Sequence, residues 1–240
     1  MIDFEYEQYD FKKAMQFNVD NRFAHLLKNN GFIKYKKNKY VREKNQIVQI
    51  VSFQVGKDRM KVFAMFIPIY VTTDNCLEYG IELTGSNGYG LLNGKYFTTV
   101  YEPELLNREI QYKNYCELHK LSLQKIYSAL EEGIIPEMDA VDSLDKFIMR
   151  LHNQDSWFFG STVLPGRNKN MMYEYVMGVY KCLNNDFDNG MNILNRIQAI
   201  DCIWWEILKK YETKSVDDFM EKYHENCDEM RRFYKLGKKA

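Results

Sequence analysis

The fold is decided between Gly31 and Val71, where the chain reads GFIKYKKNKYVREKNQIVQIVSFQVGKDRMKVFAMFIPIYV. β-Branched and aromatic residues dominate residues 47–55, and this composition fits a pleated, half-buried strand. The polar residues 56–59 that follow are typical of a turn. The stretch therefore predicts three consecutive antiparallel strands, at residues 32–42, 47–55 and 62–71.

The third predicted strand is apolar at almost every position. An antiparallel strand with one wet face alternates apolar and polar residues, so this strand needs cover on both faces. We therefore expect it in the middle of the sheet. Pro68 conflicts with a central position, because proline cannot donate a hydrogen bond to a neighbouring strand. A bulge near Pro68 would reconcile the two observations.

The first predicted strand is rich in lysine. Lysine at a sheet edge keeps that edge from pairing with another chain, which favours an edge strand with a solvated face. The same residue types also neutralise phosphates and stack on bases, so a nucleic-acid interface is the alternative. The candidate residues for that alternative are Lys34, Tyr35, Lys36, Lys37, Lys39 and Arg42.

Composition and charge narrow the cellular setting. The 240 residues contain 33 basic and 33 acidic side chains, so no net charge draws the chain to nucleic acid or to an anionic membrane. The five cysteines are an odd number and lie far apart, as in a reducing cytoplasm. No apolar run approaches the roughly 18 residues of a membrane span. The acidic start, MIDFEYEQYD, lacks the basic-then-apolar order of a signal peptide, and we expect a cytoplasmic protein without membrane contact.

The chain changes character at Pro103. Before it we expect a helix at residues 8–29, closed by Gly31, and further strands at residues 77–83 and 96–100. After it, apolar residues recur at helical spacing. The predicted helices span residues 104–132, 136–151, 171–183, 186–211 and 216–234. The pattern predicts an α+β protein: an antiparallel four- to five-stranded sheet with an N-terminal helix, then an all-helical C-terminal half packed on the sheet. Residues 1–102 and 103–240 would be its two domains, or parts of one compact unit.

Residues 171–197 are typical of a helical hairpin. Gly178, Tyr180 and the Asp186–Phe187 pair stand where a tetratricopeptide-type unit has such residues. Gly190 stands where alanine is usual. Such units need about three repeats to bury a continuous core, so one copy indicates a helical hairpin and not an array.

Four short segments resemble a known family. They are FKKAM at residues 11–15, the helix end at residues 31–32, KKNKYVR at residues 36–42 and IVQIVSFQ at residues 47–54. Through these four segments, the first part of the chain resembles the bacterial family known as domain of unknown function 4304. The resemblance covers less than half of the chain. It implies a soluble bacterial α+β protein and brings no catalytic residue with it.

Two cysteine–histidine pairs raise the possibility of a zinc site. Cys116 with His119, and His224 with Cys227, would each place two ligands on one face of a helix. The pairs are far apart in the sequence, and neither lies on a tight knuckle. We therefore favour buried cysteines with surface histidines and predict no metal.

No catalytic signature is visible. Gly94-Lys95 resembles the end of a phosphate-binding loop, but Tyr89 stands where such a loop needs glycine and Tyr96 where it needs serine or threonine. No nucleophile motif is present. We predict no cofactor and no catalytic residue, although an active site assembled by folding stays open.

The long irregular segment at residues 152–170 is the best candidate for a partner contact, because loops of this length are often functional. Aromatic residues and arginine are enriched at the centres of interfaces. The candidate residues are Trp157, Phe158, Phe159, Arg167 and Lys169. The alternative is that the aromatic residues fill the seam between the two halves.

These observations favour a non-catalytic bacterial protein that binds another protein. A nucleic-acid-associated protein that uses the lysine strand is the second hypothesis. An enzyme with a cleft between the two domains is the third.

Overall fold

The structure is a computed structural model. It describes residues 10–56, 60–70, 81–82, 120, 123–153, 167–198 and 211–237. The chain divides into two compact units. Unit 1 contains residues 1–42, 49–65 and 82–140, and unit 2 contains residues 43–48, 66–81 and 141–240. The predicted domain boundary between residues 102 and 103 lies outside the described residues and stays a prediction.

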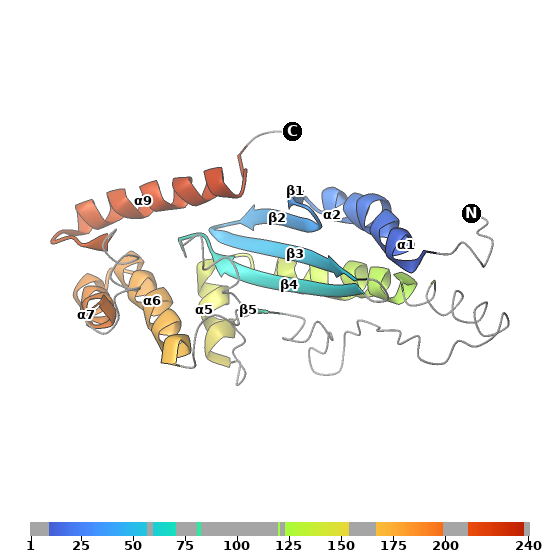
Figure 1. The fold of residues 1–240 in the computed structure, drawn as a ribbon. Coiled ribbons are helices and arrows are strands. Elements are labelled where there is room, and N and C mark those ends of the chain that lie inside the picture. Colours follow the sequence, from blue (N-terminus) through green and yellow to red (C-terminus); the bar gives the residue numbers. More distant parts are fainter. Residues whose placement is uncertain are drawn as a thin grey trace. The chain divides into compact units, whose positions relative to one another are not determined.

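The strands form one antiparallel sheet in the order β1-β2-β3-β4-β5 (Figure 1). The strands are β1 (Ile33–Lys36), β2 (Lys39–Lys44), β3 (Ile47–Val55), β4 (Met60–Pro68) and β5 (Ile81–Glu82). Consecutive strands are neighbours, as in a meander. The predicted α+β class and its four- to five-stranded antiparallel sheet are confirmed. The predicted strand at residues 96–100 lies outside the described part of the chain.

The prediction of a single strand at residues 32–42 is wrong. A turn at Lys37 and Asn38 divides this stretch into β1 and β2, which pair with each other, Lys36 opposite Lys39. Asn38 has φ 58°, a left-handed conformation that asparagine adopts more readily than most residues. A register shift between Lys34 and Lys36 also bends the short edge strand.

The apolar strand ends where its proline lies. Pro68 is the last residue of β4, so it interrupts no ladder within the strand, and the predicted bulge is not needed. Val62, Ala64 and Phe66 are buried, whereas Phe63 and Met65 on the other side are half-buried. Both faces of β4 are therefore at least partly covered, as the sequence predicted.

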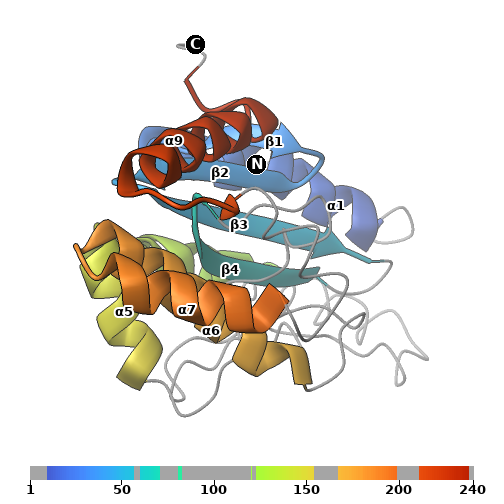
Figure 2. The same cartoon turned by 90° about the vertical axis from the view of Figure 1, so that its left-hand side faces the viewer.

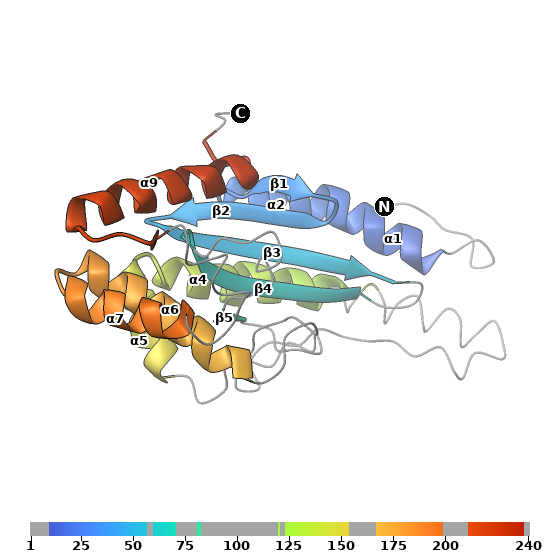
Figure 3. The same ribbon diagram turned by 60° about the vertical axis from the view of Figure 1, so that its left-hand side comes forward.

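The N-terminal helix of unit 1 is one rod with an irregular middle (Figure 3). It comprises α1 (Phe11–Asn18), the π-helical segment η2 (Val19–Phe23) and α2 (Ala24–Asn29). The Asp10 carboxylate caps its start by accepting from the Lys13 backbone N–H at 3.0 Å. At its end, Gly31 has φ +80°, and the Phe32 N–H donates to the Leu27 carbonyl at 3.0 Å. This is a Schellman motif, and the predicted terminator Gly31 is confirmed.

The sequence predicted that a helix ends at residue 132, but a second helix of unit 1 continues past this residue. Residues 123–129 continue through the π-helical η3 (Leu130–Ile134) into α4 (Ile135–Ala140). Pro136 has no N–H to donate, and the wide π turn just before it accommodates the missing bond. Phe23 joins this helix to the sheet, since its ring centroid lies 5.2 Å from that of Phe53 and 6.0 Å from that of Tyr127.

Unit 2 contains four described helices: α5 (Leu144–Asn153), α6 (Arg167–Leu183), α7 (Phe187–Gln198) and α9 (Val216–Phe233). Helix α6 begins earlier than predicted, and the single helix predicted at residues 136–151 is wrong, because residues 141–143 separate α4 from α5. Helices α6 and α7 form a hairpin (Figure 2). A Cβ at Gly190 would lie 2.6 Å from the Gly178 carbonyl oxygen, so glycine lets the two helices approach closely.

The helices of unit 2 pack against the strand residues that belong to the same unit. The Tyr70 carbonyl accepts from the Tyr175 hydroxyl at 2.8 Å and from Asn226 Nδ2 at 3.1 Å. The Tyr223 hydroxyl donates to Gln46 Oε1 at 2.7 Å. Helices α6 and α9 thereby cover the ends of β3 and β4, which is the packing of helices on the sheet that the sequence predicted.

Candidate binding surface

Strand β1 begins the strand order of the sheet, and exposed lysines follow its edge and the adjoining turn. We name this surface the lysine edge; it consists of Lys34, Lys36, Lys37 and Lys39. All four side chains are exposed. The surface thus concentrates positive charge in a protein whose net charge is zero.

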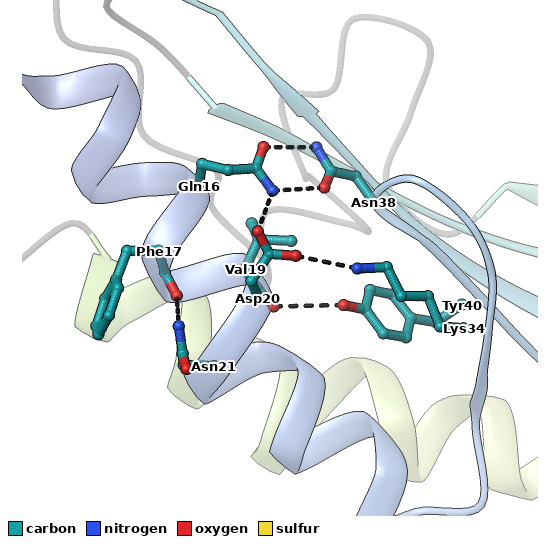
Figure 4. A network of polar contacts seen from close by, with 8 residues as sticks. All are labelled: Gln16, Phe17, Val19, Asp20, Asn21, Lys34, Asn38 and Tyr40. Carbon is teal, nitrogen blue, oxygen red and sulfur yellow. Dashed lines mark hydrogen bonds and ion pairs between the residues drawn. The ribbon is translucent and has the colours of Figure 1, made fainter.

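The turn of the lysine edge is fixed to the N-terminal helix by a reciprocal pair of amides (Figure 4). Gln16 Nε2 donates to Asn38 Oδ1 at 2.8 Å, and Asn38 Nδ2 donates to Gln16 Oε1 at 3.1 Å. The Asn38 carbonyl also accepts from the Phe53 N–H at 2.8 Å. These bonds hold both the side chain and the backbone of Asn38, so they orient the turn that carries Lys37.

Asp20, in the π-helical segment η2, is the acidic neighbour of the lysine edge (Figure 4). Its carboxylate accepts from Gln16 Nε2 at 2.8 Å and from Lys34 Nζ at 3.1 Å. The hydrogen bond from Gln16, helped by that from Lys34, lowers the pKa of Asp20, and the bond to Asp20 raises the pKa of Lys34. Asp20 and Lys34 are therefore both ionised at neutral pH.

The helix adds a further contact below the lysine edge. The Tyr40 hydroxyl donates to the Val19 carbonyl at 3.4 Å, and burial raises the pKa of Tyr40. The wide turn of η2 leaves carbonyls such as that of Val19 available to side chains, which is one reason why π segments recur at functional sites. The side chain of Tyr40 is buried and points into unit 1.

Tyr35 and Arg42, two of the six nucleic-acid candidates, are also inside unit 1. Tyr35 is buried, and Lys36 Nζ lies 5.0 Å from the centre of its ring. Arg42 is only 5% exposed. The structure thus brings four candidates to the surface, and it uses Tyr35 and Arg42 for packing.

Arg42 is enclosed by partners on every side. It donates to Gln49 Oε1 at 2.6 Å, to the Asn30 carbonyl at 2.6 Å and to Asp139 Oδ1 at 2.7 Å. Its guanidinium carbon lies 4.3 Å from the centre of the Phe32 ring. Burial lowers the pKa of Arg42, and the charge of Asp139 opposes that shift. These contacts join β2, β3, α2 and α4, so Arg42 is a structural residue.

Phe17 is an exposed apolar residue that the sequence analysis did not single out. It is 50% exposed on α1, and its carbonyl accepts from Asn21 Nδ2 at 2.7 Å (Figure 4). The signal that could have identified it is its position outside the apolar stripe that includes Met15 and Phe23, both of which are buried.

The described thiols and the most deeply buried phenols lie in unit 2. Burial raises the pKa of Cys182 to about 12 and that of Cys227 to about 11. Burial also raises the pKa of Tyr70, Tyr211 and Tyr223. At neutral pH these groups are protonated, so the thiols are poor nucleophiles.

The cysteine and histidine residues that were considered as zinc ligands are only partly within the described residues. Cys227 is buried and His224 is exposed, as the sequence analysis favoured. Cys116 and His119 lie outside the described residues. In the ranges that the structure describes, no three histidine, cysteine or carboxylate side chains lie together as metal ligands would.

The side chains of the predicted partner contact lie outside the described residues. Trp157, Phe158 and Phe159 lie outside the described residues. Arg167 and Lys169 fall in the first turn of α6 and not in a loop, but their side chains are also outside what is described. This contact stays a prediction.

None of the helices in the described ranges combines the length and the apolar character that crossing a membrane requires. No family model, curated protein or solved structure matches the chain. The resemblance to domain of unknown function 4304 therefore stays a prediction.

Proposed function

We propose that the protein is a non-catalytic binding protein of the bacterial cytoplasm, and that its lysine edge recognises an acidic segment of another protein. The observation that carries the proposal is the geometry of the β1–β2 hairpin. Four exposed lysines are held there by a turn that is fixed to the helix through Gln16 and Asn38. A preorganised group of like charges favours a ligand of opposite charge.

Edge protection and acidic recognition are compatible. Lysines at an edge repel neutral and basic strands, which keeps the sheet from pairing at random. The same charges attract a polypeptide rich in aspartate and glutamate. The Asp20 carboxylate forms an ion pair with Lys34 of this surface at 3.1 Å, and the four exposed lysines lie along β1 and the adjoining turn.

An acidic polypeptide fits this surface better than a nucleic acid does. Binding of single strands combines phosphate contacts with stacking of bases on aromatic rings. Tyr35 and Tyr40, the aromatic residues within this lysine-rich stretch, are buried. Arg42 is engaged by Gln49, Asn30 and Asp139. The carboxylate of Asp20 beside Lys34 would also repel phosphates.

The chemistry of the described residues supports binding over catalysis. Catalytic groups need a pKa near the working pH and a partner to exchange protons with. The thiols of Cys182 and Cys227 have raised pKa values, and the exposed carboxylates with resolved shifts, such as those of Asp10 and Asp20, have lowered ones. The hypothesis of an enzyme with a cleft between its domains stays a prediction.

The segment with Trp157 and Arg167 is a second proposed contact with the same partner. The family resemblance supports a bacterial origin, and the odd number of cysteines, five, supports a reducing compartment. A pull-down from the native cell with the parent and the Trp157→Ala/Arg167→Ala variant tests this contact. Identical partner sets would remove the contact from the proposal.

The experiment for the lysine edge measures binding of fluorescent peptides by anisotropy at low salt. The probes are an eight-residue peptide with alternating glutamate, its glutamine counterpart and a single-stranded oligonucleotide. We expect the parent to bind the glutamate peptide and the Lys36→Glu/Lys39→Glu variant to bind it at least tenfold more weakly, about 1.4 kcal/mol.

The matched control is Lys28→Glu/Lys125→Glu, which makes the same change in net charge at exposed helical positions of unit 1. It should bind like the parent. Preference for the oligonucleotide over the glutamate peptide would favour the nucleic-acid alternative. Equal losses in both variants would mean that total charge, and not the lysine edge, determines binding.

A further inference from the structure

We propose that Asp20 occupies the position at the lysine edge that a carboxylate of the partner takes, and that the partner displaces Asp20 to bind there. This inference rests on the proposed function of the lysine edge. It names Gln16 and Lys34 as the donors that hold one glutamate or aspartate side chain of the acidic segment. It also identifies a competitor that is built into the same fold.

Two donors from different elements converge on the Asp20 carboxylate (Figure 4). Gln16 Nε2, on α1, donates to Oδ2 at 2.8 Å, and Lys34 Nζ, on β1, donates to Oδ1 at 3.1 Å. Each carboxylate oxygen thus has its own donor. Hydrogen bonds to an ionised group are stronger than those between neutral groups, and a carboxylate accepts them on both oxygens. The two donors therefore form a binding position for a carboxylate, which Asp20 fills in the free protein.

The Gln16 amide is held in place by Asn38. It has two N–H bonds to donate. Nε2 donates to Asn38 Oδ1 at 2.8 Å as well as to Asp20, and Oε1 accepts from Asn38 Nδ2 at 3.1 Å. Because Asn38 is buried in the turn, the amide stays beside the same position when Asp20 leaves. The position is thus preorganised for an incoming carboxylate.

The electrostatic surroundings favour a negative charge at this position. The hydrogen bond from Gln16, that from Lys34, and the positive charges of Lys34 and Lys37 lower the pKa of Asp20, against the opposing effect of partial burial. These groups would act in the same way on a carboxylate of the partner, because the Coulomb energy depends on where the charge lies and not on which chain carries it.

The contact with Asp20 is weak enough to be exchanged. The Asp20 and Lys34 side chains are 41% and 54% exposed, and ion pairs between exposed side chains contribute about 0–1 kcal/mol. A single free carboxylate still competes poorly, because Asp20 belongs to the same chain and has an effective concentration on the order of millimolar. A segment with several carboxylates also gains contacts with Lys37 and Lys39. Asp20 thereby restricts the lysine edge to ligands that carry several acidic residues.

A double-mutant cycle on Asp20 and Lys34 tests the exchange. The readout is the anisotropy assay with the glutamate peptide, whose ends are capped so that its carboxylates are all side chains. Asp20→Asn removes the competitor and should bind the peptide about fivefold more tightly than the parent. Lys34→Met should change the affinity of the parent by less than about twofold, because it removes a contact from the free protein and from the complex alike. In the Asp20→Asn background, Lys34→Met should weaken binding about fivefold.

Two further variants keep the cycle interpretable. Glu132→Gln removes an exposed carboxylate of η3 in the same unit, so it is the matched control for net charge and should bind like the parent. Asp20→Ala leaves no acceptor for Lys34 and should repeat the gain of Asp20→Asn. Additive effects of the substitutions at Asp20 and Lys34, or an equal gain in Glu132→Gln, would show that Asp20 acts only through its charge. Either result would overturn the inference.

The same assay separates this inference from the proposed function. Equal binding by the parent, Asp20→Asn and Asp20→Ala, with loss of binding in Lys36→Glu/Lys39→Glu, would overturn the inference and leave the function standing. Tighter binding of the oligonucleotide than of the glutamate peptide by Asp20→Asn would assign the position to a phosphate and overturn the inference. No binding of the peptide by any of these chains would overturn the proposed function, and the inference with it.

Discussion

Arg42 in unit 1 and Asn226 in unit 2 are both buried polar side chains, with 5% and 3% exposure, but they are satisfied differently. Arg42 donates to three partners, each within 2.7 Å. Asn226 donates to the Tyr70 carbonyl and the Tyr211 hydroxyl, whereas its own Oδ1 has no hydrogen-bond partner among the described residues. At these two positions, unit 1 buries a charge with three hydrogen-bond acceptors, and unit 2 buries a neutral amide whose oxygen is unsatisfied within the described part of the chain.

The difference follows from the cost of desolvation. A buried charge without partners costs several kcal/mol, so a chain retains one only where its partners are complete. A neutral acceptor without a partner costs about 1–3 kcal/mol, which close packing can offset. Unit 1 should depend on directional polar contacts, and unit 2 should depend on packing and on the neutrality of its buried groups.

Loss of Arg42 should have the largest effect. In Arg42→Met the shape is roughly kept, but the hydrogen bonds that Arg42 donates to Gln49 Oε1, the Asn30 carbonyl and Asp139 are lost. We expect the free energy of unfolding, measured with urea, to fall by about 3–5 kcal/mol. Asp139→Asn keeps an acceptor for Arg42 and should cost about 1 kcal/mol. A loss below about 1 kcal/mol in Arg42→Met would contradict the role of this contact set.

Close packing in unit 2 gives the second largest effect. In Gly190→Ala the new Cβ would contact Cys182 Sγ and lie 2.8 Å from the Cys182 backbone nitrogen. Since backbone atoms cannot move aside easily, the free energy of unfolding should fall by about 2–3 kcal/mol. Gly178→Ala is the control, because its nearest neighbour is the Leu194 side chain at 2.7 Å, which can rotate. Equal effects of the two substitutions would show that backbone approach is not the cause.

Alkaline pH should destabilise unit 2. The pKa values of the buried Cys182 and Cys227 thiols are raised from 9.0 to about 12 and about 11. The contribution of the two protonated thiols to the free energy of unfolding is complete well below pH 9. It is lost as the pH rises from 9 through the pKa values of the folded state, because the thiols of the unfolded chain release their protons first. At pH 9 each of the two thiols is ionised in half of the unfolded molecules. Together they lower the free energy of unfolding by about 0.8 kcal/mol.

The measurement is urea unfolding at pH 7 and pH 9, under reducing conditions. Cys182→Ala/Cys227→Ala should lose less stability over this interval than the parent. Arg42 keeps its charge throughout, so unit 1 supplies no such loss through that residue. A parent that is equally stable at both pH values would contradict the assignment of neutral buried thiols.

The smallest predicted effect concerns the anchor of the lysine edge. Gln16→Ala removes both bonds to Asn38 and one to Asp20, all in a partly solvated setting. We expect a loss of about 0.5–1 kcal/mol, with faster hydrogen exchange in the β1–β2 turn. Asn21→Ala, which removes a bond to the Phe17 carbonyl on the same helix, is the control and should leave the turn unchanged.

The outline of the fold could be predicted because it depends on local patterns. The β-branched and aromatic composition of residues 47–55 predicts β3, and the helical spacing of Phe219, Tyr223 and Met230, all buried, predicts α9. The sequence pattern did not predict the β1–β2 turn, although Asn38 is a residue type common in turns. The lysines on both sides of Asn38 conceal the end of one strand and the start of the next. The sequence pattern predicts a helix that begins at residue 136, because the sequence alone does not show the π turn before Pro136.

The candidate surface was predicted only in part. Exposed lysines at an edge follow from composition, and Lys34, Lys36, Lys37 and Lys39 are where the pattern placed them. The burial of Tyr35 and Arg42 does not follow from the composition of this stretch. Arg42 is buried because Asp139, 97 positions later, comes within 2.7 Å.

The sequence by itself determined the strand at residues 47–55, the C-terminal helix α9, the left-handed helix end at Gly31, and the basic character of the first hairpin. Those properties arise from the spacing of apolar side chains and from backbone sterics within a few residues. Only the tertiary structure decided which charged side chains are buried and paired inside the protein and which are exposed on its surface. That choice depends on contacts such as Arg42 with Asp139 and Gln16 with Asn38, which join segments that no local pattern connects.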